Sequence, residues 1–278
     1  MPTVVARRTA WQRGPVRNTV GRDWTSVPRR PADAIKVGCC GFPRRLEEYA
    51  RHLDAVEVQQ TFYRLPRLQT VERWRARVPP SFTFTLKAWQ LVTHPPTSPT
   101  YRRLGRAIPE SRWDRYGFFA PSDEVAEAWA QTLVVARVLQ APVVLVQCPA
   151  SFVPTRVHVA RLRRFFRTAP RDGLAIAWEP RGDWPPTLVA RLCRELGLIH
   201  CVDPLADASR HGRPHYFRLH GRTGYRYRHT DDDLAMVAAA CRGPAYVFFN
   251  TIAMWDDALR FRRLVDDAGG APHRARDR

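Results

Sequence analysis

Short apolar runs alternate with amphipathic stretches along the chain from Ile35 onward. Eight of these runs are five or six residues long and rich in Val, Phe, Ile or Tyr, and each closes near a polar residue: 35–40, 55–59, 82–87, 143–147, 174–179, 198–203, 216–220 and 246–250. Runs of this length and composition are typical of strands buried on both faces, as in parallel sheets. We therefore predict eight parallel strands.

The stretches between these runs carry helical patterns. Apolar residues between 46 and 53 repeat at i, i+3, i+4 and i+7, which is the period of a half-buried helix. Ser122 is a suitable N-cap for a long helix, and Thr230 opens a sequence of the capping-box form. Further helices are predicted near residues 70–78, 156–168, 186–196 and 254–267.

Eight strands alternating with helices predict an α/β protein, a TIM-like (β/α)8 barrel. Two irregularities are expected in it. A long insertion rich in proline and aromatic residues follows the third strand, between Lys87 and Ser122. The interval between Asp203 and His215 holds only a turn or a very short helix, so helix 6 is reduced or absent. The alternative is a doubly wound open sheet, but such sheets usually have fewer strands and a Gly-rich first turn that Gly38–Gly41 does not match.

The two ends of the chain differ from the predicted barrel. Residues 1–34 hold seven arginines and two acidic residues, with no hydrophobic periodicity and no apolar segment of a secretory signal. We interpret them as a basic, disordered extension or the product of an upstream start codon; a nucleic-acid-binding arm and an organelle transit peptide are alternatives. Residues 271–278 form a short basic tail. The prediction is one barrel domain over residues 35–270.

Composition narrows the class of protein. The 278 residues carry a formal charge of +19, yet only Lys36 and Lys87 are lysines among the 45 basic residues. We interpret this arginine-dominated charge as an indication of anionic partners such as nucleic acid or phosphates. No apolar run reaches the roughly 18 residues of a membrane-spanning helix, and the six cysteines match no C-x-x-C or zinc spacing. We expect a reduced, cytoplasmic protein with no membrane attachment and no obligate protein partner.

Strand alternation predicts which polar side chains face the barrel interior, where catalytic groups of such barrels lie at the C-terminal strand ends. Six charged or ionisable residues converge there, namely Glu57, Lys87, Glu179, Asp203, Arg218 and His220. Charges in a barrel interior are costly unless paired, so a functional site is favoured for the group. For single residues the alternative is a structural ion pair, for instance Glu57 with Lys87 or Glu179 with Arg218.

Roles are assigned to these residues by their chemistry. The catalytic candidates are Glu57, Glu179, Lys87, His220 and Asp203. The candidates for substrate binding near the same strand ends are Arg181, Arg218, Gln147 and Asn250.

The loop after the seventh predicted strand is a second candidate feature. It has two glycines, and arginines alternate with tyrosines along it. Loops after strands seven and eight commonly bind phosphate in these barrels; arginine forks match phosphate oxygens, and tyrosines stack on bases or sugars. We therefore predict that Arg222, Tyr225 and Tyr227 contribute to an anion site. The alternative is a solvated basic loop.

No cofactor motif is evident. A divalent metal held by Glu57, Glu179, Asp203 and His220 is a weak candidate, since Lys87 and Arg218 nearby would repel a cation. The chain has no H-E-x-x-H sequence, no serine nucleophile elbow and no phosphate-cradling Gly-rich loop.

Six segments in order resemble one family: Val37–Gly41, Val56–Tyr63, Phe84–Ala88, Trp178–Arg181, Phe217–Arg222 and Tyr246–Asn250. They are similar to the DUF72 family, also called YecE-like, a group of uncharacterised proteins. The resemblance implies a TIM-like barrel over about residues 35–268 and carries no settled reaction; a likeness to endonuclease IV-type barrels is a fold-level analogy. The chain departs from the usual pattern in its first loop, which commonly begins Gly-x-Ser-Gly-Trp and is long.

Three hypotheses follow for function. The first is an enzyme acting on a phosphate-bearing substrate, a nucleic acid or sugar phosphate, with Lys87, Arg218 and Arg222 holding the anion and Glu57 or Glu179 as general base. The second is a non-catalytic module that binds nucleic acid or a phosphorylated metabolite. The third is a metal-dependent sugar isomerase or lyase.

Overall fold

The computed structural model describes residues 35–269, so the predicted extension 1–34 and tail 271–278 lie outside the described residues. Eight parallel strands close into a barrel in sequence order, with β1 hydrogen-bonded to β8. The strands are β1 (Ile35–Cys40), β2 (Ala55–Val58), β3 (Thr83–Lys87), β4 (Val143–Gln147), β5 (Ala175–Glu179), β6 (Ile199–Val202), β7 (His215–Leu219) and β8 (Ala245–Phe249). The predicted TIM-like barrel is confirmed.

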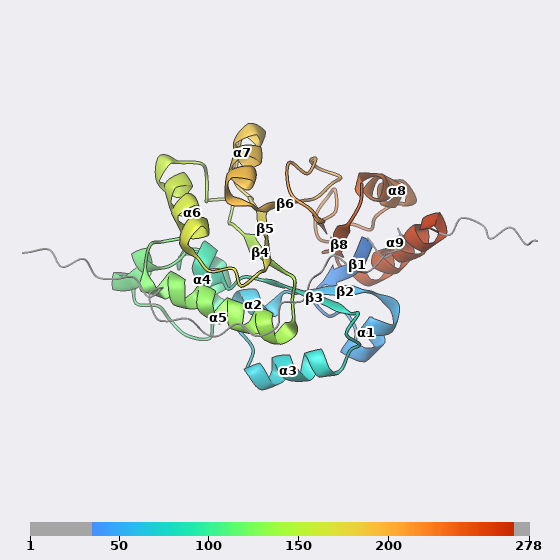
Figure 1. Cartoon of the computed structure of the whole chain (residues 1–278), viewed down its shortest axis with the longest axis horizontal. Helices are drawn as coiled ribbons and strands as arrows, with labels where there is room; N and C mark the ends of the chain where they lie inside the picture. Colours follow the sequence, from blue (N-terminus) through green and yellow to red (C-terminus); the bar gives the residue numbers. More distant parts are fainter. Residues whose placement is uncertain (1–34, 270–278) are drawn as a thin grey trace, which may run out of the picture.

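Helices surround the barrel (Figure 1). The longer ones are α1 (Leu46–His52), α3 (Leu68–Ala76), α5 (Asp123–Leu139), α6 (Arg156–Thr168), α7 (Pro186–Leu196), α8 (Asp231–Ala240) and α9 (Met254–Gly269). Two single-turn helices, α2 (Gln60–Tyr63) and α4 (Gln90–Thr93), are absent from the sequence prediction because four residues are too few to show a helical period. Within the described part of the chain, no helix combines the length and apolarity needed to cross a bilayer.

Both predicted irregularities are present. The insertion after β3 contains α4 and two 3-10 helices, η3 (Pro99–Arg103) and η4 (Glu110–Arg115), before α5 begins. Between β6 and β7 the chain runs as an irregular segment from Asp203 to Pro214, with no helix. Figure 1 shows this segment as a loop between α7 and α8. One position of the outer helical ring is therefore filled by loop.

The hydrophobic residues divide into two clusters, as strand alternation predicts. The larger cluster lies between the sheet and the helices and includes the fully buried Trp129 and Trp178. The smaller cluster fills the barrel interior and consists of Cys40, Ala55, Val143, Leu145, Ala177, Ile199, Cys201, Tyr216 and Phe248. Since burying one large apolar side chain contributes roughly 1.5–3 kcal/mol, both layers stabilise the barrel on which the polar strand ends are mounted.

Side-chain caps fix where two of the helices begin. At the start of α5, Ser122 Oγ accepts a hydrogen bond from Val125 N at 3.3 Å and donates one to Arg115 O at 2.6 Å. At the start of α8, Thr230 and Asp233 form a reciprocal capping box with both bonds at 3.1 Å. The Ser122 hydroxyl thus ties the end of the long insertion to α5.

Replacing Ser122 with alanine should lower the free energy of unfolding by about 1 kcal/mol, because it removes the N-cap acceptor of α5. Urea denaturation followed by circular dichroism measures the change. Ser122→Thr keeps the hydroxyl and is the matched control, which we expect to stay close to the wild type. Equal destabilisation by both variants would contradict this assignment.

Candidate functional site

The C-terminal ends of the eight strands form one face of the barrel, called the mouth below. Strand register brings distant residues together there: Cys40 of β1 lies opposite Glu57 of β2, and Gln147 of β4 lies opposite Glu179 of β5. Arg218 reaches this level from β7. The inward positions expected for these polar side chains agree with the structure.

Arg218 is the centre of the mouth. Its Nε donates to Glu57 Oε1 at 3.1 Å, and its Nη1 donates to Glu179 Oε2 at 2.5 Å. Its guanidinium also reaches Gln147 Oε1 at 3.5 Å and Cys40 Sγ at 3.6 Å. All three charged side chains are at least 95% buried. We call Arg218, Glu57 and Glu179 the Arg218 cluster; it joins β2, β5 and β7.

Two members of the cluster, Glu179 and Arg218, hold each other in their ionised forms. Burial raises the pKa of Glu179, but the charge of Arg218 together with His220 and Arg181 outweighs burial and holds that pKa well below its usual range. Burial likewise lowers the pKa of Arg218, and the charges of Glu179 and Glu57 then raise it well above its usual value. Each charge therefore stabilises its partners against proton transfer.

Glu57 has further partners that fill its remaining lone pairs. Tyr216 OH donates to Glu57 Oε2 at 2.7 Å and lies 2.9 Å from Thr85 Oγ1. Gln59 Nε2 donates to Glu57 Oε1. Tyr216 was not among the candidate residues, although the alternation that directs Arg218 inward also directs Tyr216 inward. Glu57 is thus fixed by β2, β3 and β7 together.

A more exposed polar layer lies around His220. The backbone N–H of His220 donates to Asp203 Oδ2 at 2.8 Å, and Asn250 Nδ2 lies 3.1 Å from His220 Nδ1. His220 Nε2 lies 3.2 Å from Glu179 Oε1 and 2.6 Å from Arg181 Nη2. Burial lowers the pKa of His220 and the charge of Arg218 adds to that effect, whereas the hydrogen bond that the imidazole donates to Glu179 raises the pKa in part. The imidazole is therefore neutral at neutral pH.

Arg181 and His220 are the members of this layer that face a cavity of about 220 Å³. The Arg181 side chain is 36% exposed and that of His220 is 23% exposed. Arg181 Nε also lies 2.7 Å from Glu179 Oε1. Asp203, Asp207 and Arg210 line the same cavity. A ligand entering here meets the guanidinium of Arg181 and the neutral imidazole of His220, beside the carboxylates of Glu179, Asp203 and Asp207.

Lys87 ends β3 at the same level but stands outside the Arg218 cluster. Its side chain is 6% exposed, and Nζ lies 3.5 Å from the ring centroid of Phe62 on α2. No carboxylate oxygen of the described residues lies within 4.0 Å of this Nζ, so the expected Glu57–Lys87 ion pair is not formed. Burial and then the charge of Arg218 lower the pKa of Lys87 from 10.5 to about 7. The amine is therefore substantially unprotonated at neutral pH.

The backbone around Lys87 is rigidly held. Thr61 Oγ1 donates to Lys87 O at 2.7 Å, and Ala88 N donates to Leu145 O at 2.8 Å. The Phe62 ring packs edge-on against Tyr63 and His94, with centroids 5.0 and 4.7 Å away. The sequence pattern missed this aromatic wall because it lies on the single-turn helix α2 and in the long insertion.

The proposed metal ligands do not form a cation site. Among residues 35–269, no group of three His, Cys, Asp or Glu side chains converges as metal ligands. Glu57 and Glu179 direct their oxygens at the Arg218 guanidinium, while Asp203 accepts the backbone N–H groups of Leu205 and His220. These residues do not fit a divalent metal.

The loop after β7 is organised differently from the expected anion site. Arg222 Nε donates to Asp233 Oδ1 at 2.7 Å, and Tyr227 OH donates to Asp233 Oδ2 at 2.6 Å. Asp233 also caps α8, whose first turn holds Asp231 and Asp232 as well. Two of the three predicted residues are thus engaged with an acidic helix start that would repel phosphate, and Tyr225 is 58% exposed.

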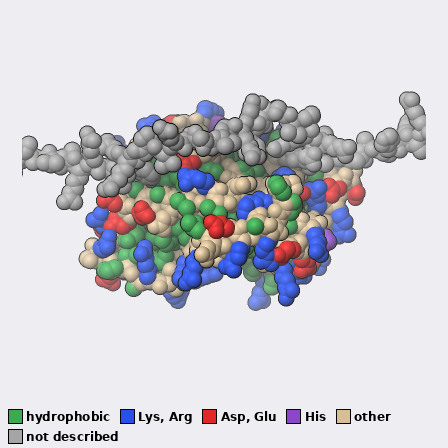
Figure 2. All heavy atoms as spheres, turned by 60° about the horizontal axis from the view of Figure 1, so that its bottom comes forward, with side chains coloured by type: hydrophobic (Ala, Val, Ile, Leu, Met, Phe, Trp, Pro, Cys, Tyr) green, Lys and Arg blue, Asp and Glu red, His purple; other side chains and the backbone are tan. Residues whose placement is uncertain are grey.

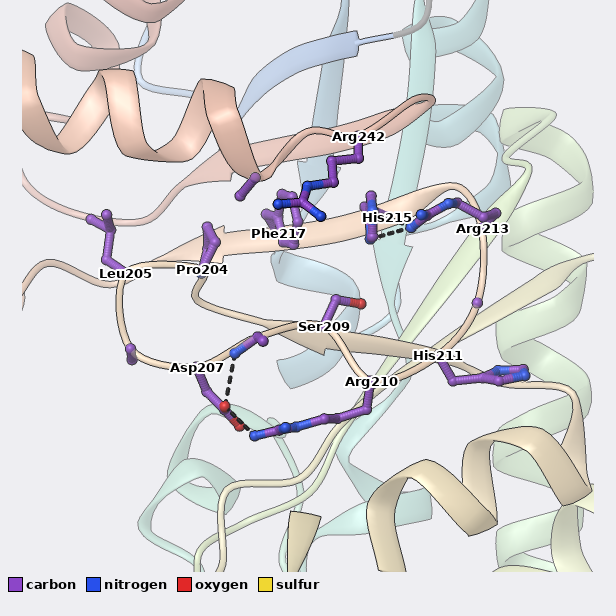
Figure 3. A pocket seen from close by; sticks show the side chains of 14 residues that line it. Pro204, Leu205, Asp207, Ser209, Arg210, His211, Arg213, His215, Phe217 and Arg242 are labelled. Atoms are coloured by element: carbon purple, nitrogen blue, oxygen red, sulfur yellow. Dashed lines mark hydrogen bonds and ion pairs between the residues drawn. The ribbon is translucent and has the colours of Figure 1, made fainter. Parts of the chain in front are cut away.

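A larger cavity, of about 860 Å³, lies outside the barrel where helix 6 is missing. Figure 3 shows His215 and Phe217 of β7 facing it, with Arg213 and Arg242 beside them. The two rings stack with centroids 5.1 Å apart. Both belong to the outward set of β7, so this cavity is separate from the mouth and from its ionisable cluster.

Comparison with known proteins gives one family. The family model described as "Protein of unknown function DUF72" matches residues 39–277. A DUF72 family protein of Enterococcus faecalis V583 is 19% identical with a TM-score of 0.64, covering 84% of this chain and 95% of that one. A second, from Thermotoga maritima MSB8, is 21% identical with a TM-score of 0.56, covering 84% and 99%. A xylose isomerase domain containing protein of Salmonella typhimurium LT2 shares the fold at 12% identity, with a TM-score of 0.54 and coverage of 87% and 99%.

Among curated proteins, the UPF0759 protein YecE of Escherichia coli K12 is 43% identical over 49 residues. That match covers 18% of this chain and only 18% of the length of YecE. The solved structures show the fold, and the resemblance seen in the sequence motifs is confirmed at the level of the family.

Replacing Arg218 with methionine should lower the free energy of unfolding by about 3–5 kcal/mol at neutral pH, because it leaves two buried carboxylates unpaired. The deficit should shrink as the pH falls toward about 4, since uncompensated burial raises the pKa of a carboxyl and lets it take up a proton. Urea denaturation at several pH values measures both effects.

The matched control for Arg218 is Arg163→Met. Arg163 pairs with Glu195 at 2.9 Å on the outer helices, with a side chain 32% exposed, and its loss should cost about 0–1 kcal/mol. If Arg218→Met cost no more than this surface variant, the Arg218 cluster would not be the interaction that holds the mouth together.

Proposed function

The chain belongs to the DUF72 family, and we propose that it is an enzyme acting on a small phosphate-bearing substrate at the mouth of its barrel. Lys87 is the proton-transferring group in this proposal. The observation that carries it is the division of charges at the mouth: both buried glutamates share Arg218, whereas Lys87 is buried against Phe62 without a carboxylate partner. Catalytic sites are where such unpaired buried ionisable groups concentrate.

The glutamates have a positioning role in this proposal rather than the role of general base. An effective general base has a pKa near the working pH. Arg218, His220 and Arg181 together outweigh the burial of Glu179 and lower the pKa of its carboxyl. Glu57 accepts hydrogen bonds from Arg218, Tyr216 and Gln59. Their contribution is to orient Arg218 and His220 and to set the charge of the mouth.

Lys87 meets the pKa requirement that Glu179 fails. With burial lowering its pKa to about 7, the amine takes up and releases a proton near neutral pH. An arginine in its place would stay protonated, because guanidinium does not lose its proton in proteins. The end of a barrel strand is also the place from which catalytic groups act in this fold.

The substrate-facing groups are those of the exposed layer. Arg181 provides a guanidinium for a phosphate oxygen, while Gln147, Asn250 and His220 provide hydrogen bonds to hydroxyl or carbonyl oxygens. Arg181 and His220 line the cavity of about 220 Å³, which has room for a molecule the size of a sugar phosphate; Lys87, Gln147 and Asn250 are not among its lining residues. Arg222, Tyr225 and Tyr227 lie on the loop beside this layer and are not needed for phosphate contact.

The pairing of surface arginines favours a small molecule over nucleic acid as the substrate, although five arginines gather around one hollow between α6 and α7: Arg156, Arg163, Arg164, Arg167 and Arg191. Several outer arginines are paired with acidic residues, such as Arg163 and Arg167 with Glu195. On the face drawn in Figure 2, basic side chains are interspersed with acidic and hydrophobic ones rather than gathered into a track. Binding along a nucleic acid backbone relies on a continuous basic stripe.

Purified protein assayed with phosphomonoesters, sugar phosphates and phosphodiesters should turn over a sugar phosphate without added Mg2+, Mn2+ or Zn2+. The value of kcat/KM should rise with pH to a plateau with an apparent pKa near 7, because the neutral amine of Lys87 is the active form. Lys87→Met should lower kcat by about 100-fold or more.

The same assay with Glu179→Gln separates positioning from proton transfer. This variant should lower kcat/KM while leaving a titrating group in the profile, whereas Lys87→Met should abolish the rise through pH 7. Binding of sugar phosphates without turnover would favour the non-catalytic module. A wild-type profile unchanged in Lys87→Met would refute the role of Lys87.

Lys87→Met should also stabilise the protein at pH 7, by about 1–4 kcal/mol, because a buried cationic group is replaced by an apolar side chain of similar length. The folded pKa of Lys87 lies below its unfolded value, so the cost of burial is complete below pH 7 and disappears as pH rises to about 10. The stabilisation should therefore shrink between pH 7 and 10 in urea denaturation. A less stable variant at pH 7 would show that the amine contributes to folding rather than to chemistry.

A further inference from the structure

We propose that Lys87 is a nucleophile that forms a covalent imine with the carbonyl carbon of a phosphorylated aldehyde or ketone. This inference rests on the proposed function, since the substrate is held at the same mouth. It adds the chemical class of the substrate and a covalent intermediate.

The basic residues of the chain give the first reason. Lysine occurs at two of the 45 basic positions, and arginine occupies the other 43. Lys36 lies near the start of β1, at the end of the barrel opposite the mouth, whereas Lys87 ends β3 at the mouth. A chain that otherwise uses arginine has at the mouth the one basic side chain whose neutral form is a nucleophile.

The contacts of Lys87 give the second reason. A lysine that served only to balance charge would lie against a carboxylate, yet Glu57 and Glu179 both pair with Arg218, and Glu179 also pairs with Arg181. A lysine that served only to hold phosphate would do so less well than arginine, whose fork matches two oxygens. Lys87 Nζ instead lies against the face of Phe62 in a desolvated position.

The aromatic wall suits the cationic form of the adduct. Phe62 is held by ring contacts to Tyr63 and His94, so its face is fixed 3.5 Å from Nζ. A protonated imine at Nζ carries a delocalised positive charge, which the face of an aromatic ring attracts. Its hydration cost on burial is smaller than that of a compact ammonium.

Charged groups from several elements face Lys87 and hold its amine near the point of deprotonation. Burial has the largest effect on the pKa of Lys87. The charged groups that act on this pKa are Arg218 of β7, Glu179 of β5, Glu57 of β2 and Arg181 after β5, and His94 after α4 lies beside the amine. Burial and the charge of Lys87 also lower the pKa of His94 to about 3, so that imidazole is neutral. The two arginines favour the neutral amine, and the two glutamates partly offset them.

The covalent step needs no further reactant. The lone pair of Nζ attacks the carbonyl carbon, a C–N bond forms, and the carbonyl π electrons move to oxygen, which takes one amine proton. The carbinolamine then loses its C–O bond as the second amine proton leaves with the hydroxyl as water, giving the C=N bond. Hydrolysis reverses the sequence and restores the amine.

The test is trapping by sodium cyanoborohydride, which reduces the imine to a stable secondary amine. Full-length protein is incubated with dihydroxyacetone phosphate or with glyceraldehyde 3-phosphate, and peptides are mapped by mass spectrometry. We expect an adduct on the Lys87 peptide, formed at least about tenfold faster at pH 7.5 than on the Lys36 peptide, because an ordinary lysine is almost fully protonated there. Labelling of Lys87 should increase with pH through about 7.

Three variants and one ligand pair control the experiment. Lys36→Arg should keep the adduct, and Lys87→Arg should lose it. Circular dichroism checks that each variant is folded. If the Lys87→Arg variant does not fold, Lys87→Met provides the same test. Unphosphorylated dihydroxyacetone should label Lys87 at least about tenfold less, because it lacks the group that Arg181 meets. Equal labelling of both lysines, or no adduct on Lys87 with either phosphate, overturns the inference.

The failure of this inference differs from a failure of the proposed function. Turnover that depends on Lys87 and rises through pH 7, with no adduct trapped, would overturn the imine and retain proton transfer. An adduct on Lys87 without turnover of any sugar phosphate would support the nucleophile and remove the enzyme proposal.

Discussion

The buried guanidinium of Arg218 between Glu57 and Glu179 is the interaction on which the mouth of this barrel depends. It joins β2, β5 and β7 at the level where the hydrophobic interior ends, and all three side chains are almost fully buried. Two carboxylates so deep in a barrel are costly unless a cation lies between them. The long arginine side chain reaches both carboxylates, and its planar guanidinium donates a hydrogen bond to each of them.

This pairing determines what the other residues at the mouth are free to do. Glu57 and Glu179 pair with Arg218 and Arg181 rather than with Lys87. Burial together with the charge of Arg218 lowers the pKa of Lys87 to about 7. Because Glu179 also contacts Arg181 and His220, the exposed layer is oriented by the buried one. In the proposed mechanism, the ion pairs are the support and the unpaired amine of Lys87 is the reactive group. A protein that uses arginine almost throughout has a lysine at this position.

Much of this arrangement follows from the period of the strands. Alternation alone directs Glu57, Lys87, Gln147, Glu179, Arg218 and Asn250 inward, and the length of the apolar runs predicts the barrel. Alternation does not say which cation lies between which anions, because that depends on side-chain reach across the barrel. Arg218 bridges both glutamates, so the Glu179–Arg218 pair agrees with expectation and the Glu57–Lys87 pair does not. The hydrogen bonds from Arg222 and Tyr227 to Asp233 depend on the conformation of a loop, which has no sequence period. The Phe62 ring beside Lys87 lies on a helix of one turn, which is too short to show a period either.

The state of the Lys87 amine is the central claim, and the scarcity of lysine makes it directly measurable. Protein labelled with 13C-lysine should give two sets of side-chain NMR signals, and Lys87→Arg and Lys36→Arg assign them. The account predicts that the Lys87 signal moves with a midpoint near pH 7. A Lys87 signal that stays in the ammonium form until about pH 10, as for an ordinary lysine, would contradict it.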